Sequence, residues 1–353
     1  MTKLFLWKKA LVLYIKTHIK KLMELSIIIP TYKRSDDLKD TIDSILAQSM
    51  LPKEIIVVDS AYDTKTKIIV EKYTAIEHTI PIYYVLNQID SSAVARNVGA
   101  DYASSDILLF LDDDAILDED YIKEIHNAYT IFENAIIVQG NIISEDRKIR
   151  KVNKIWNGLW QNYNKCFNLF HSTPHEMKVL KSGRTTAPPN PSFPINCQWA
   201  SGCNFSIKKE VFNKYKFDEN LMKYAYGEDK DLSYRIYKEH PMSIYLIPNA
   251  KLLHKGFFNK NAPVKRAVIA EKTYALYFVA KNMNKPLNYS LFMWSEFGNL
   301  LTDIIYLFLF IFRYNAFFSL KVKYDVYAYY VCAKYFSSIK NKDLEHINEK
   351  YIL

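Results

Sequence analysis

In the first 120 residues of the chain, short apolar runs rich in β-branched residues alternate with amphipathic helical patterns. The apolar runs are Ser26–Pro30, Glu54–Asp59, Ile82–Val85 and Ile107–Leu111. Helical patterns begin near Ser35, Thr64 and Ala93. Continuous apolar strands joined by helices through short links are typical of a parallel sheet that is covered on both faces. The alternation therefore predicts an α/β fold, in which ligands bind beyond the carboxyl ends of the strands.

Composition excludes several kinds of site. The 353 residues include only 8 glycines, and neither GxGxxG nor GxxxxGK[ST] occurs, which excludes a Gly-rich phosphate loop. A formal net charge of +9 indicates an anionic partner, but no aromatic-laced basic patch of the kind that favours nucleic acid is present. The four cysteines contain no CxxC pair. A zinc site built from Cys166, His171, His175 and Cys197 is disfavoured, because Pro174 interrupts the helical spacing of the two histidines.

Both ends of the chain carry segments that suit a membrane surface or a protein surface. Residues 1–22 form a basic amphipathic pattern, which fits a helix in an anionic headgroup region or a helix packed on the protein. Within the apolar stretch 291–318, the longest uncharged run is Ile304–Phe312, which is shorter than the roughly 20 residues that span a bilayer. We expect a half-buried helix there and further helices over Lys321–Lys350. These C-terminal helices could meet lipid or pair two subunits into a homo-oligomer.

The clearest chemical feature is a triplet of carboxylates, Asp112–Asp114, directly after the fourth apolar run. Adjacent carboxylates repel one another unless a cation relieves the repulsion, and Mg²⁺ or Mn²⁺ prefers such oxygen ligands. A solvated helix start is the alternative, since three more acids follow at 118–120. Arg96 lies on the preceding helix and can reach the same rim. An arginine beside a metal site without a glycine loop suggests a diphosphate held by metal and side chains.

Six short stretches then occur in a fixed order along the chain. They are IIIPTYKR (Ile27–Arg34), VVDSAYD (Val57–Asp63), ARNVGA (Ala95–Ala100), FLDDDAIL (Phe110–Leu117), WASGCNFSIKKEVF (Trp199–Phe212) and GEDKDLSYRI (Gly227–Ile236). In this order they resemble family 2 glycosyltransferases of the GT-A fold, over about Leu25–His254. The resemblance implies a Rossmann-like, mostly parallel sheet flanked by helices. The Gln-x-x-Arg-Trp signature of processive synthases is absent, which favours the addition of one sugar or a few.

The resemblance also implies an organisation of the chain. The basic segment 1–22 would precede a GT-A domain over 23–256. Its nucleotide-sugar half would cover about 23–118 and its acceptor half about 119–256. An apolar, basic helical C-terminal extension would cover 257–353.

Roles for individual residues follow from the same resemblance. Donor binding is expected at Pro30, Thr31, Tyr32, Arg34, Asp59, Arg96, Asp112 and Asp113. Asp112, Asp114 and His254 would hold a divalent metal, Mn²⁺ or Mg²⁺. Asp229 would be the catalytic base and Glu228 would orient the acceptor, which Trp199, Gly202 and Glu228 would contact. Ordinary structural explanations exist for the same residues, since acids favour a helix start and tryptophan and histidine also serve in packing.

Together these expectations describe a metal-dependent, inverting, non-processive glycosyltransferase for cell-surface polysaccharide assembly. Its donor would be a nucleoside-diphosphate sugar, with a UDP-sugar expected first, and its acceptor a glycan or a lipid-linked saccharide. We expect it at the cytoplasmic face of the membrane, bound peripherally to an anionic surface. Two alternatives stay open: a sugar-phosphate nucleotidyltransferase of the same fold, and a non-enzymatic basic protein that binds membrane or nucleic acid.

Overall fold

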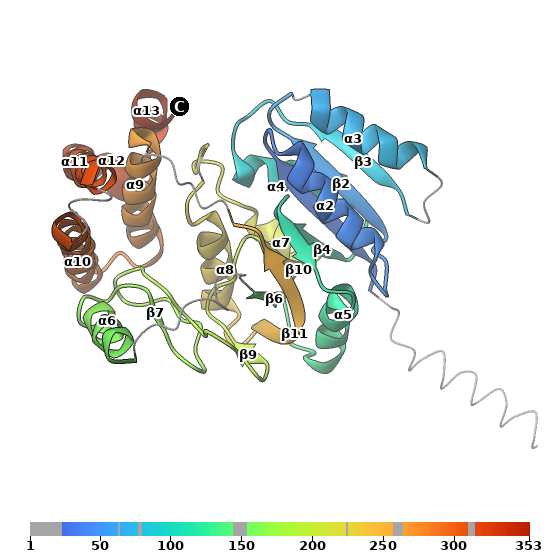
Figure 1. Ribbon diagram of the computed structural model, residues 1–353, viewed down its shortest axis with the longest axis horizontal. Coiled ribbons are helices and arrows are strands. Elements are labelled where there is room, and N and C mark those ends of the chain that lie inside the picture. The colour runs from blue at the N-terminus through green and yellow to red at the C-terminus, as the bar shows by residue number, and fades with distance from the viewer. Residues whose placement is uncertain are drawn as a thin grey trace, which may run out of the picture.

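The computed structural model describes residues 23–62, 64–76, 80–143, 154–223, 225–256, 264–309 and 315–353 (Figure 1). The basic segment 1–22 and the end of the run Ile304–Phe312 lie outside these residues. Strands and helices alternate at the start of the chain as expected. They are β1 (Leu25–Thr31), α2 (Ser35–Leu46), β2 (Glu54–Asp59), α3 (Thr64–Ala75), β3 (Ile82–Leu86), α4 (Ser92–Tyr102) and β4 (Ile107–Leu111).

The middle of the chain, in its described residues, adds further strands, from two to eleven residues long, and four helices. Its elements are β5 (Ala115–Leu117), α5 (Tyr121–Ile131), β6 (Ile137–Ile143), α6 (Lys154–Cys166), β7 (His171–Ser172), β8 (Thr186–Ala187), β9 (Ile195–Asn196), β10 (Asn204–Lys208), α7 (Lys209–Tyr215), α8 (Glu228–Glu239) and β11 (Ile244–His254). The apolar run Ser243–Ile247 predicts a last strand that ends at Ile247, and that end is wrong. After a register shift between Ile247 and Lys251, β11 resumes its pairing with β6 and also pairs with β5. His254 therefore ends the strand.

Among the described residues, nine strands form a mixed, mostly parallel sheet in the order β3-β2-β1-β4-β10-β6-β11-β5, with β9 beside β11. β3, β2, β1 and β4 are parallel to one another, whereas β10 lies antiparallel between β4 and β6. Because of this reversal, the start of β10 lies beside the end of β4, with Asn204 opposite Leu111. The loop before β10 therefore reaches the same rim as the loops that follow β1 and β4.

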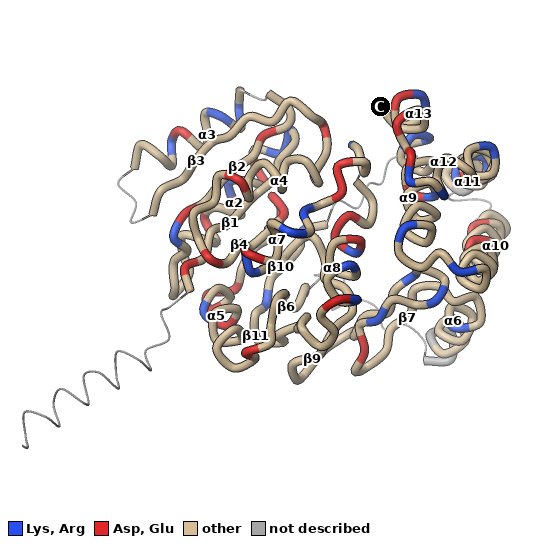
Figure 2. Tube along the Cα trace, turned by 180° about the vertical axis from the view of Figure 1, so that it is seen from behind, with Lys and Arg blue, Asp and Glu red and all other residues tan. Residues whose placement is uncertain are grey.

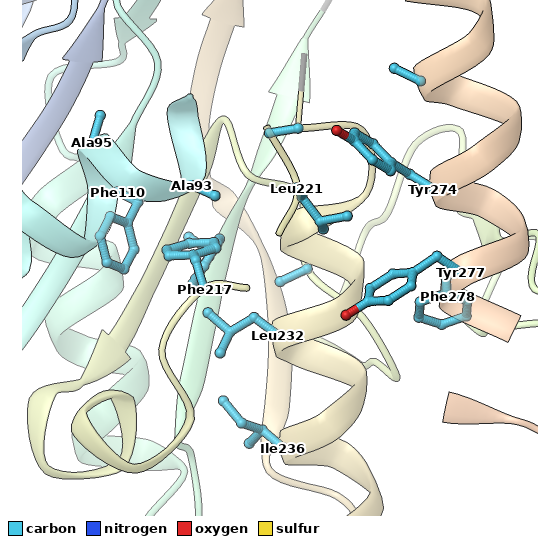
Figure 3. Close-up of a cluster of buried hydrophobic side chains, with 14 of the residues drawn as sticks. Ala93, Ala95, Phe110, Phe217, Leu221, Leu232, Ile236, Tyr274, Tyr277 and Phe278 are labelled. Carbon is cyan, nitrogen blue, oxygen red and sulfur yellow. The ribbon is translucent and has the colours of Figure 1, made fainter. Parts of the chain in front are cut away.

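Side chains alternate across the sheet, and this alternation divides the core into two clusters. In β1, Ile27 and Ile29 belong to a cluster that includes residues of α2, α3 and α5. Ile28, between them, belongs to a second cluster that includes residues of α4, α8 and α9. Figure 3 shows part of this second cluster, in which Phe110 of β4 and Leu232 of α8 are labelled. The sheet is thus covered by helices on both faces, as the sequence predicted.

Helices make up the C-terminal part of the chain. They are α9 (Lys265–Asn282), α10 (Pro286–Leu309), α11 (Asn315–Lys334), α12 (Phe336–Lys340), α13 (Glu345–Ile347) and the π-helix η2 (Asn348–Ile352). α9 contacts both α8 and α11, and its Tyr274 and Phe278 lie in the second core cluster, so this region packs against the sheet unit (Figure 1). Within the described ranges, no helix combines the length and the apolar character needed to cross a membrane.

Two glycines in helices offer a matched test of the packing of α4 on the sheet. A Cβ atom added at Gly99 of α4 would overlap Ile28 Cγ2 and lie 3.0 Å from Val58 Cγ2. At Gly158 of α6 it would meet nothing within 4 Å. We expect Gly99→Ala to lower the free energy of unfolding by about 1–2 kcal/mol, because overpacking outweighs the gain in helix propensity. Gly158→Ala should raise it by up to ~1 kcal/mol. Urea denaturation followed by circular dichroism measures both, and equal effects would contradict close packing at Gly99.

Candidate functional site

A cavity of about 300 Å³ opens at the rim where the loops after β1 and β4 meet α4 and α8. Its lining residues are Pro30, Thr31, Tyr32, Arg34, Ser60, Asp90, Ser91, Ser92, Ala95, Arg96, Asp112, Asp113, Lys223 and Glu228. Every residue expected to bind the donor is therefore in the lining, with the exception of Asp59. Segments far apart in the sequence meet here because the carboxyl ends of parallel strands share one edge of the sheet.

A buried guanidinium, that of Arg96 on α4, connects the two sides of this cavity. Arg96 Nη2 lies 2.8 Å from Asp112 Oδ1, and Nη1 lies 2.5 Å from Glu228 Oε1. Nη2 also donates to the carbonyl of Gly202 at 3.3 Å. Burial alone would lower the pKa of Arg96, but the carboxylates of Glu228 and Asp112 raise it. One cation therefore links the loop after β4, the loop before β10 and the start of α8.

The middle carboxylate of the triplet, Asp113, is bound by residues that follow β1. Thr31 Oγ1 donates to Asp113 Oδ2 at 2.8 Å, and Arg34 Nη1 donates to Oδ1 at 3.0 Å. Arg34 Nη2 also reaches Asp114 Oδ2 at 2.7 Å. Burial raises the pKa of Asp113 to about 7, with the charges of Asp112 and Asp114 adding to the effect against the influence of Arg34. Asp113 thus joins the loops after β1 and β4.

The other two carboxylates of the triplet face His254 at the end of β11. Possible ligand atoms of Asp112, Asp114 and His254 all lie within 4.8 Å of one another, and the described residues contain no other such group. His254 Nε2 lies 3.0 Å from Asp114 Oδ1 and 3.7 Å from Asp112 Oδ2. Hydrogen bonding to the two carboxylates raises the pKa of His254 to about 10. Burial raises the pKa of Asp114, but His254 and Arg34 outweigh it and lower that pKa to about 2.

This cluster fits a divalent cation. Asp114 Oδ1 is buried and accepts no well-directed hydrogen bond from the described residues, so it keeps a lone pair for a ligand bond. The two carboxylates stabilise a positive charge on His254. A divalent metal bound there would supply positive charge in place of that proton. Two carboxylates and one imidazole form a ligand set that suits Mn²⁺ and also accepts Mg²⁺.

The start of α8 places two acids beside the loop that precedes β10. Asp229 Oδ2 accepts the backbone N–H of Gly202 at 2.7 Å, and Oδ1 accepts that of Lys230 at 2.6 Å. A Cβ atom at Gly202 would lie 3.2 Å from Asp229 Cβ and 3.3 Å from Arg96 Nη2, so a side chain would crowd both groups. Burial and the charge of Asp229 raise the pKa of Glu228 to about 7, against the influence of Arg96.

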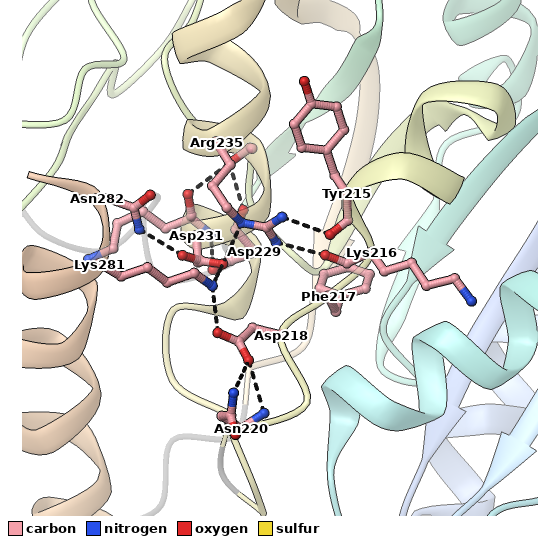
Figure 4. Close-up of polar contacts among 12 residues, drawn as sticks. Tyr215, Lys216, Phe217, Asp218, Asn220, Asp229, Asp231, Arg235, Lys281 and Asn282 are labelled. Carbon is pink, nitrogen blue, oxygen red and sulfur yellow. Dashed lines mark hydrogen bonds and ion pairs between the residues drawn. The ribbon is translucent and has the colours of Figure 1, made fainter. Parts of the chain in front are cut away.

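A polar network behind these acids holds the first turn of α8 (Figure 4). Asp231 accepts from Arg235 and from Lys281 of α9, both at 2.8 Å, and from Asn282 at 2.7 Å. Arg235 in turn donates to the carbonyls of Tyr215 and Lys216, both at 2.7 Å. The position of Asp229 therefore depends on α9 as well as on its own helix.

Asp59 and Trp199 are among the expected residues that are absent from the cavity lining. Asp59 is fully buried and accepts from the Tyr84 hydroxyl and from the backbone N–H of Ala61, both at 2.8 Å. The indole N–H of Trp199 donates to the carbonyl of Thr186 at 3.1 Å, and its ring packs on the hydrophobic core.

Sequence reasoning did not assign six residues of the cavity lining to the site, namely Ser60, Asp90, Ser91, Ser92, Ala95 and Lys223. Ser91 is the N-cap of α4, so the start of that helix was an available signal. Lys223 has a left-handed backbone, with φ of 51°, in an irregular loop that carries no motif.

Comparisons with known proteins find a family model and curated relatives that match parts of the chain. The model of the family described as "Glycosyl transferase family 2" matches residues 26–215. Glycosyltransferase GlyA of Streptococcus pneumoniae serotype 4 is 22% identical over 225 residues, which are 63% of this chain and 29% of that protein. TuaG of Bacillus subtilis, named as a teichuronic acid biosynthesis glycosyltransferase, is 36% identical over 89 residues, which are 25% of this chain and 35% of that protein. The chain thus spans about a third of the length of these curated relatives.

The fold is also found among solved structures. The crystal structure of GalNAc-T7 with UDP, GalNAc and Mn²⁺ aligns with a TM-score of 0.53 at 15% identity, over 79% of this chain and 55% of that one. This likeness confirms the expected GT-A-like fold, a mostly parallel sheet flanked by helices with helices after it. Since the family model covers more than half of its residues, the chain belongs to glycosyl transferase family 2.

Proposed function

We propose that this chain transfers one sugar, or a few in succession, from a nucleoside-diphosphate donor to a glycan or lipid-linked acceptor, with inversion at the anomeric carbon. The observation that carries the proposal is the buried Arg96, which joins Asp112 of the metal cluster to Glu228 beside Asp229. The UDP, GalNAc and Mn²⁺ of the similar structure make a UDP-sugar the first donor to test. TuaG is named for teichuronic acid biosynthesis, which supports a role in cell-surface polysaccharide assembly. The location that we propose for this role is peripheral, at the cytoplasmic face of the membrane.

The charges around the cavity explain why a donor would require a metal. Six carboxylates line or adjoin the cavity, namely Asp90, Asp112, Asp113, Asp114, Glu228 and Asp229, against the permanent cations of Arg34, Arg96 and Lys223. Both arginines already neutralise carboxylates of this set. A diphosphate would therefore meet an acidic rim. A divalent cation bound by Asp112, Asp114 and His254 would neutralise the diphosphate and stabilise it as a leaving group.

Asp229 is the proposed base for the acceptor hydroxyl. Its two backbone hydrogen bonds fix the carboxylate in one orientation, and each oxygen keeps a second lone pair. In the reaction, the acceptor oxygen bonds to the anomeric carbon as the bond from that carbon to the diphosphate oxygen breaks. The hydroxyl proton passes to Asp229. Glu228, held by Arg96, lies beside the base and would orient the acceptor.

The base assignment predicts a loss of transfer without a loss of donor binding. We expect Asp229→Asn to lower the transfer rate by about 10³-fold, because an amide cannot accept the proton. The rise in melting temperature caused by UDP with Mn²⁺ should stay unchanged. A radiolabelled-sugar transfer assay and thermal denaturation measure the two effects. Asp101→Asn, on the exposed end of α4, is the control and should leave both unchanged. Full activity of Asp229→Asn would mean that another group is the base.

The metal assignment predicts different behaviour for two adjacent residues. Asp114→Asn should abolish the part of the UDP-induced thermal stabilisation that depends on Mn²⁺, because it removes a ligand charge. Asp113→Asn is the matched control, since Asp113 contacts Thr31 and Arg34 and is not part of the cluster. It should keep the Mn²⁺ dependence even if nucleotide binding weakens. Equal loss of the Mn²⁺ dependence in both variants would contradict the assigned ligands.

A further inference from the structure

The outer helices of the C-terminal region bury their carboxylates. α6, α10, α11 and α12, which we call the outer helical face, contain three carboxylates in all, those of Glu296, Asp303 and Asp325. These residues are only 6%, 6% and 0% exposed. Each carboxylate is paired inward, Glu296 with Lys272 at 3.0 Å, and Asp303 and Asp325 with Lys321 at 2.7 and 3.0 Å. Helices that face water normally place such charges on the outside.

Apolar side chains occupy the exposed positions instead. The exposed apolar residues of α6 and α10 are Leu159, Trp160, Leu287, Met293, Trp294, Phe297 and Phe308. Met293 is 70% exposed and Phe297 is 52% exposed, whereas large apolar patches are rare on soluble monomers. The two helices form one surface, because the Tyr163 hydroxyl donates to the carbonyl of Gly298 at 2.7 Å and Phe167 stacks on Trp294 at 4.7 Å.

A hollow deepens this surface. An apolar groove of about 690 Å³ lies among α9, α10, α11 and α12, lined in part by Tyr289, Phe292, Met293, Phe297, Leu300 and Phe336. The groove is large enough to admit an alkyl chain beside the exposed side chains. Met293 and Phe297 of α10 belong both to this groove and to the exposed apolar surface.

On these helices, every exposed charged side chain that the structure describes is positive. Lys165, Lys323, Lys334 and Lys340 are exposed, and no carboxylate of the outer helical face is. Figure 2 shows where charged residues lie along these helices. Lysines around an apolar surface that includes tryptophan match the chemistry of an anionic bilayer, whose headgroups attract cations while its interior takes apolar side chains.

We propose that the outer helical face docks this protein on an anionic lipid bilayer. A second copy of the chain fits the face less well, because a symmetric pairing would bring the same lysines of both copies together. The proposal rests on the proposed function in one respect only, which is that docking would give access to a lipid-linked acceptor. The binding itself requires neither donor nor metal.

Sedimentation of the full chain with sucrose-loaded vesicles tests the surface in the absence of substrate. We expect the protein to pellet with vesicles of phosphatidylcholine mixed with phosphatidylglycerol, and much less with phosphatidylcholine alone. Leu287→Gln/Met293→Gln should weaken this binding by about tenfold or more, because two exposed apolar side chains that would enter the bilayer are lost. The control Tyr102→Gln/Ile131→Gln replaces equally exposed apolar residues on α4 and α5 and should bind like wild type.

A second pair of substitutions tests the contribution of the lysine charges to vesicle binding. It also keeps the proposal testable if the first pair misfolds. Lys323→Gln/Lys340→Gln should weaken binding to the anionic vesicles, and added salt should weaken binding of the wild type. Absence of pelleting, or wild-type pelleting of both variant pairs, would overturn the proposal. So would a dimer detected by light scattering that Leu287→Gln/Met293→Gln converts to a monomer. Stabilisation by UDP with Mn²⁺ is measured separately, so failure of the proposed function would leave vesicle binding intact.

Discussion

The candidate site depends on one buried cation, Arg96. Its guanidinium has two carboxylate partners from segments more than a hundred residues apart, and a third contact to the carbonyl of Gly202. Removing one partner of a buried charge is costly, by about 3–5 kcal/mol, because the other partner is left unpaired in a medium of low dielectric. Neither side of the cavity can therefore form its native geometry without the other. Because β10 runs antiparallel between β4 and β6, the loop that contains Gly202 reaches the rim and contacts Arg96.

The first half of the fold could be predicted closely because local signals there agree with the tertiary structure. Strands buried on both faces need continuous apolar runs, and β1, β2 and β4 have them. The end of β11 was missed because Pro248 and Asn249 interrupt its apolar pattern, and pairing resumes only after them. The strands β7, β8 and β9 have two residues each, which is too short for any periodicity. The burial of the carboxylates of α10 could not be predicted from the sequence either, because their cationic partners belong to other elements.

The motifs of the site were visible in the sequence, but the contacts of several residues were not. Arg34 was expected to bind the donor, and in the structure its guanidinium contacts Asp113 and Asp114. Trp199 was expected to contact the acceptor, and its indole N–H donates a hydrogen bond to the carbonyl of Thr186. These contacts could not be predicted, because a motif predicts which residues gather at a rim, whereas the direction of each side chain depends on partners that only the folded chain supplies.

The register shift in β11 makes the site sensitive to the number of residues in this strand. Ile247 pairs with Gly140 and Lys251 with Asn141, so three residues of β11 are inserted where β6 has none. The carbonyl of Ala250 fills the space that a side chain at Gly140 would need. Successive residues of a strand point to opposite faces, so one residue more or fewer in this insertion would exchange His254 for a neighbour. The chemical nature of the third residue in the proposed metal site is thus decided by the number of residues in this insertion. This stretch should tolerate substitutions better than insertions or deletions.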